Sequence, residues 1–212
     1  MISIMDIDQL SRRNLSKLYS SGKSLTEVAL VLSCSPNKIV YWMNKFNIKR
    51  RSHSDAAYIK QNPNGDPFKI KKKLSKEETF LYGLGLGIYW GEGNKNPKIP
   101  SLRIANTDPD LIRIFLHFLK SVYGLSEKRF SYSIVSFNDI NPEDARLYWA
   151  KKLKINPKKF GKITIIPTQG KGTYKRKSKF GVCTVQGNNS KLRRLVILEL
   201  DRIKQKYINL PR

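Results

Sequence analysis

The fold of this chain is constrained most by the stretch Tyr82–Gly93, which reads Tyr-Gly-Leu-Gly-Leu-Gly-Ile-Tyr-Trp-Gly-Glu-Gly. Ser75 followed three residues later by Glu78 has the form of a capping box, and the apolar run from Phe80 predicts a helix over about residues 76–92. Each glycine inside a helix costs about 1 kcal/mol relative to alanine, so this helix needs a compensating contact. Its interior glycines are Gly83, Gly85, Gly87 and Gly91.

Three of these glycines, Gly83, Gly87 and Gly91, recur every four residues and predict one stripe that a second helix can approach at backbone distance. The helix is expected to end at Glu92, with Gly93 free to adopt the left-handed conformation that often follows a helix. A carboxylate is disfavoured at the negative end of a helix dipole. Glu92 is therefore either a solvated residue at a turn or a ligand for a cation.

The end of this helix, Gly-Ile-Tyr-Trp-Gly-Glu-Gly over 87–93, resembles the second half of the motif that names the LAGLIDADG homing endonucleases. Glu92 is in register with the acidic metal ligand of that motif. Trp90 departs from it, since the motif has its first Asp there, and the motif start is Gly-Leu instead of Leu-Ala. In this family, two such helices pack through small residues and bring two acids to the base of a DNA-binding saddle. One copy of the motif therefore implies a homodimer through Gly83, Gly87 and Gly91 and a pseudo-palindromic DNA site.

The resemblance also implies the chemistry of the site. A divalent metal, Mg²⁺, is expected at Glu92 and Gly91, where it would support phosphodiester hydrolysis. The reaction needs a positive group near the scissile phosphate, for which Lys177, Lys179 and Lys191 remain alternatives. Lys179 enters the predicted catalytic set with Glu92 and Gln186, and Arg103 is expected to contact DNA.

The charge of the chain points to a polyanionic partner. Its 212 residues carry 41 Lys and Arg against 16 Asp and Glu, a net charge of +25 with a sequence pI of about 10.1. The positive charge is spread over segments with aromatic residues, which favours double-stranded DNA over a membrane surface. No apolar run reaches the ~18 residues of a membrane span, and no signal-peptide pattern is seen. We expect a cytoplasmic, nucleoid-associated protein without membrane contact.

The N-terminal segment predicts a helix-turn-helix. Short helices are expected over residues 8–20 and 25–32, and a third helix from Pro36 to about Phe46. This pattern resembles the resolvase and transposase type of helix-turn-helix, whose second helix enters the major groove. The predicted core residues are Val28, Ala29, Leu32, Ile39, Trp42 and Phe46. The predicted DNA contacts are Asn37, Lys38, Tyr41, Lys45, Lys49, Arg50 and Arg51.

Two further regions complete the predicted organisation: a basic linker over 51–75, rich in turn residues, and a second domain over 76–212. The expected domains are thus 1–50, 51–75 and 76–212. After the glycine helix we expect strands over 101–106 and 129–138, helices over 109–123, 142–153 and 190–206, and a hairpin of 160–167 with 179–187. The hairpin tip is predicted to bind DNA through Lys171, Lys175, Arg176 and Lys177.

The predicted fold class is α+β, a three-helix unit followed by a second domain. The element order of that domain agrees with the α-β-β-α-β-β-α core of the LAGLIDADG fold, with 142–153 as an extra helix. The resemblance implies a homodimeric, homing-type endonuclease that binds specific double-stranded DNA and cleaves it with a metal. The alternative is a transcriptional regulator that binds DNA through the same fold without cleavage, and an RNA-binding protein is a third possibility. The retained Glu92 favours the nuclease, because a regulator has no need of the acid.

Overall fold

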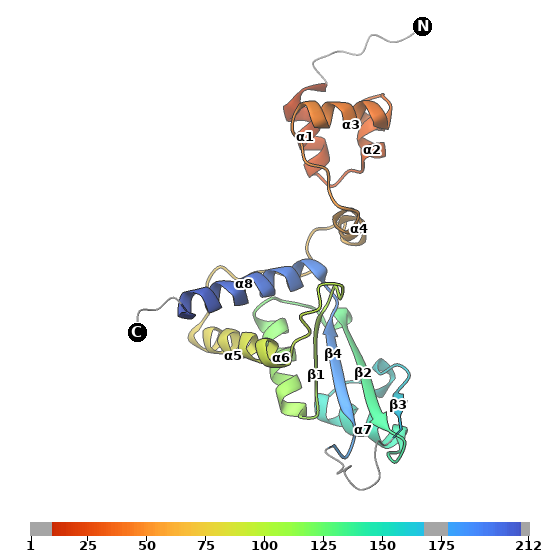
Figure 1. The fold of residues 1–212 in the computed structure, drawn as a ribbon, viewed down its shortest axis with the longest axis vertical. Coiled ribbons are helices and arrows are strands. Elements are labelled where there is room, and N and C mark those ends of the chain that lie inside the picture. The colour runs from red at the N-terminus through yellow and green to blue at the C-terminus, as the bar shows by residue number, and fades with distance from the viewer. Residues whose placement is uncertain (1–9, 168–177, 209–212) are drawn as a thin grey trace. The chain divides into compact units, whose positions relative to one another are not determined.

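The structure, a computed structural model of the chain, describes residues 10–167 and 178–208 and divides into two compact units. One unit is Met1–Asp66 and the other is Pro67–Arg212. Helices and a four-stranded sheet confirm the predicted α+β class (Figure 1). The predicted DNA contacts at the hairpin tip, Lys171, Lys175, Arg176 and Lys177, lie outside the described residues.

The first unit contains four helices: α1 (Arg12–Ser20), α2 (Leu25–Val31), α3 (Pro36–Lys45) and α4 (His53–Gln61). Serine caps begin each of them, and Ser24 forms a full capping box with Glu27 at the start of α2. Ser35 caps α3, and Pro36 occupies its first turn. The three predicted N-terminal helices are confirmed.

The small core of this unit lies between α1, α2 and α3. Val28, Leu32 and Ile39 are buried as predicted, whereas Trp42 and Phe46 are only partly buried and pack against the edge of the core. Their rings stack at 5.2 Å, and the central position belongs to Met43, which is fully buried. Thioether side chains fill irregular gaps that a rigid indole cannot enter.

The segment expected to be a linker has more structure than its composition indicates. It contains α4, whose cap Ser52 accepts a hydrogen bond from the Asp55 amide. Further along, Phe68 is buried in the core of the second unit, and the Lys69 amide donates to the Tyr123 carbonyl at 2.8 Å. An aromatic side chain inside a basic stretch therefore ties the start of this unit to its core.

The second unit is built on α5 (Lys76–Glu92) and a sheet of four strands. These are β1 (Leu102–Asn106), β2 (Phe130–Phe137), β3 (Thr164–Ile166) and β4 (Val182–Gly187), in the order β1-β4-β2-β3. The remaining helices are α6 (Pro109–Ser121), α7 (Pro142–Leu153) and α8 (Ser190–Ile208), with the short 3₁₀ helices η2 (Glu127–Arg129) and η3 (Pro157–Lys159). None of the described helices combines the length and apolar character needed to cross a bilayer.

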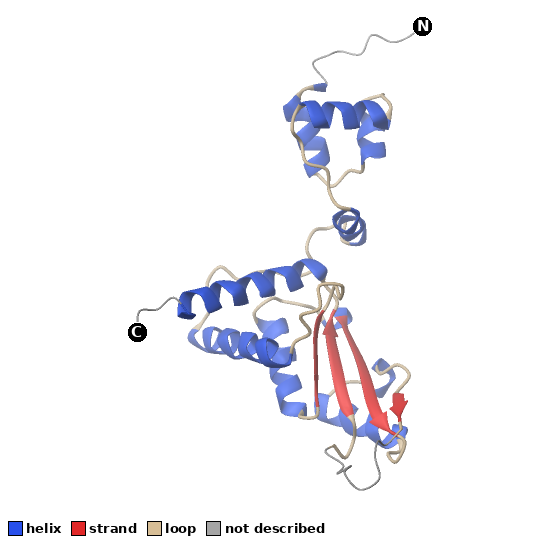
Figure 2. Ribbon diagram, in the orientation of Figure 1, coloured by secondary structure: helices blue, strands red, loops and turns tan. Residues whose placement is uncertain are grey.

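The predicted hairpin of the last two strands is wrong. β4 pairs antiparallel with both β1 and β2, while β3 pairs only with β2 and runs parallel to it (Figure 2). The side chains of Thr164–Ile166 are all exposed, which suits an edge strand. Cys183 and Val185 of β4 are fully buried on the core side, which suits a central strand.

One face of the sheet carries the core of the unit. Helices α6 and α7 pack on this face, and α5 and α8 pack beside α6 and β1 (Figure 1). Buried residues alternate along β1 and β2, as a sheet with one covered face requires, whereas in β4 Thr184 on the opposite face is buried too. The apolar strand residues of the core are Leu102, Ile104, Phe130, Tyr132, Ile134, Cys183 and Val185.

Helix α5 has the predicted bounds, but its close packing uses a different glycine from the predicted stripe. A Cβ on Gly85 would lie 2.1 Å from the Phe118 ring of α6, so this glycine lets the two helices meet. Gly93 is extended (φ −73°, ψ 143°) and not left-handed as we expected. A side chain there would collide with Tyr89, which explains a glycine without any need for positive φ.

Candidate nucleic-acid interface

The C-terminal end of α5 leads directly into the sheet. Gly93 forms an antiparallel bridge with Ile104, and the Asn94 amide donates to the Arg103 carbonyl at 2.8 Å. The backbone of Glu92 is thereby fixed beside the middle of β1. Its side chain is exposed and forms no hydrogen bond or ion pair within 10–167 and 178–208. An ionised carboxylate held at a fixed place and left without a protein partner can accept a cation.

Polar side chains gather on the sheet face opposite the core. Arg103, Gln186 and Ser131 form one row across β1, β4 and β2, according to the strand register. Ser101 donates to the Gln186 amide oxygen at 3.2 Å, and Asn188 donates to Ser131 at 2.7 Å. Gly93 bridges Ile104, the neighbour of Arg103 and the middle residue of β1, so the end of α5 lies beside the middle of this strand. The row of Arg103 and Gln186 lies one residue away along β1.

The predicted catalytic lysine, Lys179, lies at the other end of β4 from Gln186. It precedes β4, and β4 runs from Val182 toward the row that contains Gln186. Val182 alone is four residues from Gln186, which is roughly 13 Å along a strand. The Lys179 ammonium instead sits 5.7 Å from the Phe180 ring. The fold therefore places Lys179 far from Gln186 of the same chain.

The alternative lysines of the sequence analysis are Lys191 and Lys177. Lys191 is exposed near the start of α8, which follows the Gln186 end of β4, whereas Lys177 lies outside the described residues. Lys191 also takes part in an interaction within the chain. Lys191 therefore lies closer along the chain to Gln186 than Lys179 does.

The predicted glycine stripe of α5 faces outward. A Cβ added at Gly83, Gly87 or Gly91 would meet no other atom within 4 Å. Large apolar side chains flank these glycines and are also exposed, Phe80 by 75% and Trp90 by 53%. Such a face, smooth in the middle and apolar at its edges, is uncommon on the surface of a helix.

The turn after Glu92 is held by two buried side chains. The Tyr89 hydroxyl donates to the Asn94 carbonyl at 2.9 Å, and the Arg193 guanidinium of α8 donates to the Asn96 carbonyl at 2.9 Å. Tyr89 is fully buried and Arg193 is only 6% exposed. Burial raises the pKa of Tyr89, and the nearby Arg193 charge partly opposes this. Sequence reasoning missed Arg193, since only the packing of α8 brings it to this turn.

A lysine that the sequence analysis did not single out lies at the same helix end. The Lys95 ammonium donates to the Trp90 carbonyl at 2.5 Å and contacts the Gly91 carbonyl at 3.5 Å. These carbonyls lack partners inside the helix, and they carry the negative end of its dipole. A basic residue three positions after a helix-terminal acid is the signal that could have found Lys95.

A second polar cluster braces the helical side of the unit. Glu127 accepts hydrogen bonds from Tyr132 and Lys159, both at 2.8 Å, and forms an ion pair with Lys120. Burial favours a raised pKa for Glu127, but these three partners outweigh burial and lower the pKa to about 2. The cluster joins the start of β2 to α6 and η3, so its role is structural.

Helix α8 is fastened to α5 and α6 by a further polar contact. The Tyr123 hydroxyl donates to the Glu199 carboxylate. Burial and the neighbouring Glu199 charge also raise the pKa of Tyr82 on α5 to about 12. Both tyrosines therefore stay neutral at physiological pH and act as hydrogen-bonding groups.

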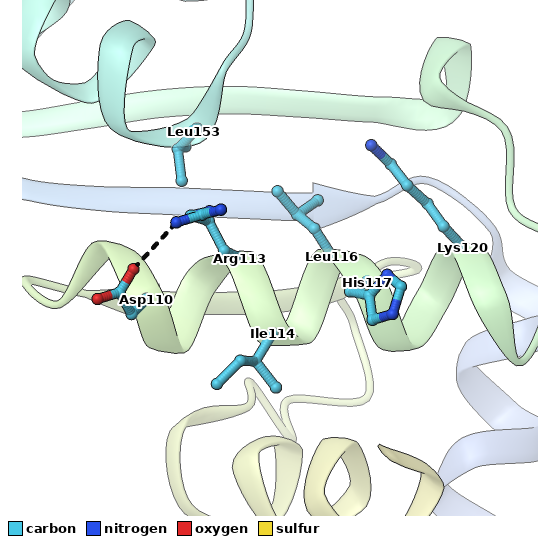
Figure 3. Close-up of a pocket in the computed structure, with 7 residues that line it drawn as sticks. All are labelled: Asp110, Arg113, Ile114, Leu116, His117, Lys120 and Leu153. Carbon is cyan, nitrogen blue, oxygen red and sulfur yellow. Dashed lines mark hydrogen bonds and ion pairs between the residues drawn. The ribbon is translucent and has the colours of Figure 1, made fainter. Parts of the chain in front are cut away.

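An open groove lies on α6, away from the sheet face that carries the polar row. Figure 3 shows Arg113 and Lys120 beside it, with Leu116 between them and the α7 residue Leu153 above Arg113. Arg113 pairs with Asp110 at 3.3 Å. Because α6 packs its buried side on the core face, this groove does not belong to the site around Glu92.

Metal ligands are sparse in a single chain. In the described part, His, Cys, Asp and Glu side chains nowhere form a group of three that could hold a metal ion. Glu92 with the Gly91 carbonyl offers two oxygen ligands at one helix end. Mg²⁺ is commonly held by one or two carboxylates together with substrate phosphates and water, so this pair fits a metal shared with DNA.

The first unit presents the predicted outward side of α3. Asn37, Lys38, Tyr41 and Lys45 are exposed, and Lys49 and Arg50 are exposed after the helix. The Lys45 ammonium lies 4.7 Å from the Trp42 ring. A positive, polar helix face beside an exposed tyrosine suits the phosphate and base contacts of a recognition helix.

Arg51, the last predicted DNA contact of this unit, also makes several contacts within the chain. Its guanidinium stacks 3.9 Å from the Tyr19 ring centroid and donates to the carbonyls of Gly22 and Lys23. Its amide also donates to the Tyr19 hydroxyl at 2.9 Å. Arg51 therefore fixes the exit of the chain from the three N-terminal helices, with its Nη1 group bonded within the unit.

Comparisons of the chain with protein-family models, with curated proteins and with solved structures found no match.

Proposed function

We propose that this protein binds specific double-stranded DNA as a homodimer and cleaves it with a divalent metal held by Glu92. The observation that carries the proposal is an unpartnered carboxylate at the end of a helix whose outward face is bare glycine flanked by apolar side chains. Two such helices packed against each other bring two Glu92 carboxylates together. This is the arrangement implied by the resemblance to LAGLIDADG endonucleases.

The dimer supplies what a single chain lacks. Glycines at positions 83, 87 and 91 allow two backbones to approach, and Phe80, Leu84 and Trp90 would lose their exposure to water. The polar rows of the two sheets would then form one continuous surface for a duplex. The net charge of +25 supports a partner with many phosphates.

Different residues of the chain would have different roles in DNA binding and hydrolysis. Glu92 and the Gly91 carbonyl would hold Mg²⁺, which when bound activates water and stabilises the leaving oxygen. Arg103 and Gln186, which pair across β1 and β4, would contact phosphate or orient water. The outward side of α3 would read a neighbouring segment of the major groove.

The test is cleavage of a randomised duplex library by the full chain and by Glu92→Gln, each with Mg²⁺ and with EDTA. The variant replaces the Glu92 carboxylate by a neutral amide of the same shape. We expect cuts at a recurring sequence that require both Mg²⁺ and Glu92. Sequence-selective binding by both proteins without cutting under any metal would refute the nuclease.

That second outcome would support the alternative, a DNA-binding transcriptional regulator. The helix-turn-helix favours it, because this unit binds DNA without any need for the carboxylate. The retained and unpartnered Glu92 is the observation against it.

Dimerisation is tested separately by sedimentation. Gly87→Leu places a branched side chain in the centre of the outward stripe, where the chain itself leaves open space. We expect this variant to fold normally and to sediment as a monomer. Lys151→Leu adds the same side chain at an exposed position of α7 and serves as the matched control. A Gly87→Leu protein that remains a dimer would exclude this helix face as the interface.

A further inference from the structure

The C-terminal end of α5 already binds a cation from its own chain. The Lys95 ammonium lies 2.5 Å from the Trp90 carbonyl oxygen and 3.5 Å from the Gly91 carbonyl oxygen. Both carbonyls belong to the last turn of the helix, next to Glu92. The ammonium thus occupies the negative end of the helix dipole, where positive charge is stabilised.

This position overlaps with the metal site of the proposed function. The Gly91 carbonyl can serve Lys95 or a metal ion, and a metal bound to this oxygen would stand close to the ammonium. Like charges at such a separation repel strongly. We propose that Lys95 is a built-in cation that a divalent metal must displace in order to bind Glu92 and Gly91. This inference rests on the proposed metal site.

The chain allows this displacement. Lys95 is exposed and forms no ion pair with a carboxylate in the described ranges, so its long side chain can swing into solvent. The turn that carries it is held by other groups, the Tyr89 hydroxyl and the Arg193 guanidinium. Removing the ammonium therefore leaves the backbone around Glu92 in place.

The expected effect follows from the charges. If the ammonium stayed about 4 Å from a divalent ion in water, their repulsion would correspond to roughly a 30-fold loss of metal affinity. Salt screens part of this electrostatic repulsion, and the repulsion falls further when the lysine side chain moves away from the metal. We therefore expect removal of the Lys95 charge to tighten metal binding at Glu92 by about fivefold to tenfold.

The experiment measures binding of Mn²⁺ alone to the full chain by electron paramagnetic resonance. Lys95→Met keeps a flexible unbranched side chain, shorter only by the terminal nitrogen, and removes its charge. Lys98→Met makes the same charge change in the same turn, at an exposed lysine whose ammonium has no contact with α5 among the hydrogen bonds and ion pairs described. Glu92→Gln, alone and combined with Lys95→Met, identifies the fraction of bound Mn²⁺ that depends on Glu92.

We expect Lys95→Met to bind Mn²⁺ about fivefold to tenfold more tightly, Lys98→Met to stay within twofold of the wild type, and the gain to vanish in the double variant. Equal affinity of the wild type and Lys95→Met at a site that requires Glu92 would overturn the inference and leave the proposed metal site intact. No Glu92-dependent binding in either protein would overturn both. Glu92-dependent binding only in Lys95→Met would support the inference in its strongest form.

Discussion

Gly85→Ala is predicted to destabilise the second unit, although alanine is the better helix former. The added Cβ would lie 2.1 Å from Phe118 Cγ and 2.5 Å from both Cδ atoms. Ordinary contact begins near 3.4 Å, so the ring has to move by more than 1 Å. Phe118 is fully buried and packs edge-on against Tyr123 at 5.3 Å, which leaves it little room.

The expected change in unfolding free energy for Gly85→Ala is the difference between a packing cost and a gain in helix propensity. Overpacking of this kind costs typically about 1–3 kcal/mol, and we place this case at the upper end because the contact is a buried ring. Replacing an interior helical glycine by alanine returns about 1 kcal/mol. The net loss is then about 2 kcal/mol, or a fall in Tm of roughly 4–8 °C for a domain of this size.

The matched control is Gly83→Ala, on the same helix and two residues away. A Cβ at this position meets nothing within 4 Å, so only the propensity gain of about 1 kcal/mol remains and Tm should rise by roughly 2–4 °C. Trp149, fully buried in the same unit, reports unfolding by fluorescence in a Trp42→Phe background at low protein concentration. A Gly85→Ala protein as stable as the wild type, or a Gly83→Ala protein less stable than it, would refute the reasoning.

Other contacts give predictions of the same kind. Since the pKa of Glu127 is lowered from 4.5 to about 2, its stabilisation is complete above pH 4.5 and disappears as pH falls through 2. Glu127→Gln should therefore have a lower Tm than the wild type at pH 7, with the difference closing between pH 4.5 and 2, and a constant difference would contradict this. Arg193→Met removes the bond to the Asn96 carbonyl, so amide hydrogen exchange over 94–99 should become about tenfold faster, whereas unchanged protection would show that the turn holds without it. Arg51→Ala loses its stacking on Tyr19 and two carbonyl contacts, and should lower the unfolding free energy of the first unit by about 1–3 kcal/mol in circular dichroism. A loss of DNA affinity at unchanged stability would instead assign Arg51 to the DNA surface.

Elements with local signals were predicted well. Helix α5 begins with the capping box of Ser75 and Glu78 and has the bounds that the sequence indicates. The helices at 109–121 and 142–153 likewise begin with an Asp or Asn cap followed by proline. Such signals act between residues three or four positions apart, so they can be read without knowledge of the rest of the fold.

Strand pairing and close packing were predicted less well. Nothing within residues 160–187 reveals that β2 separates β3 from β4, because this order depends on which strand has both sides available for hydrogen bonds. Glycine has no side chain, so the sequence does not distinguish Gly85 from the outward glycines. Only the crossing of α5 with α6 does. Similarly, the composition of residues 51–75 predicts a basic linker and does not indicate that Phe68 is buried.

The sequence by itself determined the charge of this protein, its three N-terminal helices, and a glycine-rich helix that ends on an acid. Each follows from composition or from contacts within one or two turns of a helix. Only the tertiary structure decided that Arg103 and Gln186 lie side by side in the sheet, that Lys179 lies at the other end of β4 from Gln186, and that Lys95 already covers the end of the helix. The physical reason is that strand register and side-chain reach are set by groups distant in the sequence, and their positions are fixed only when the core packs.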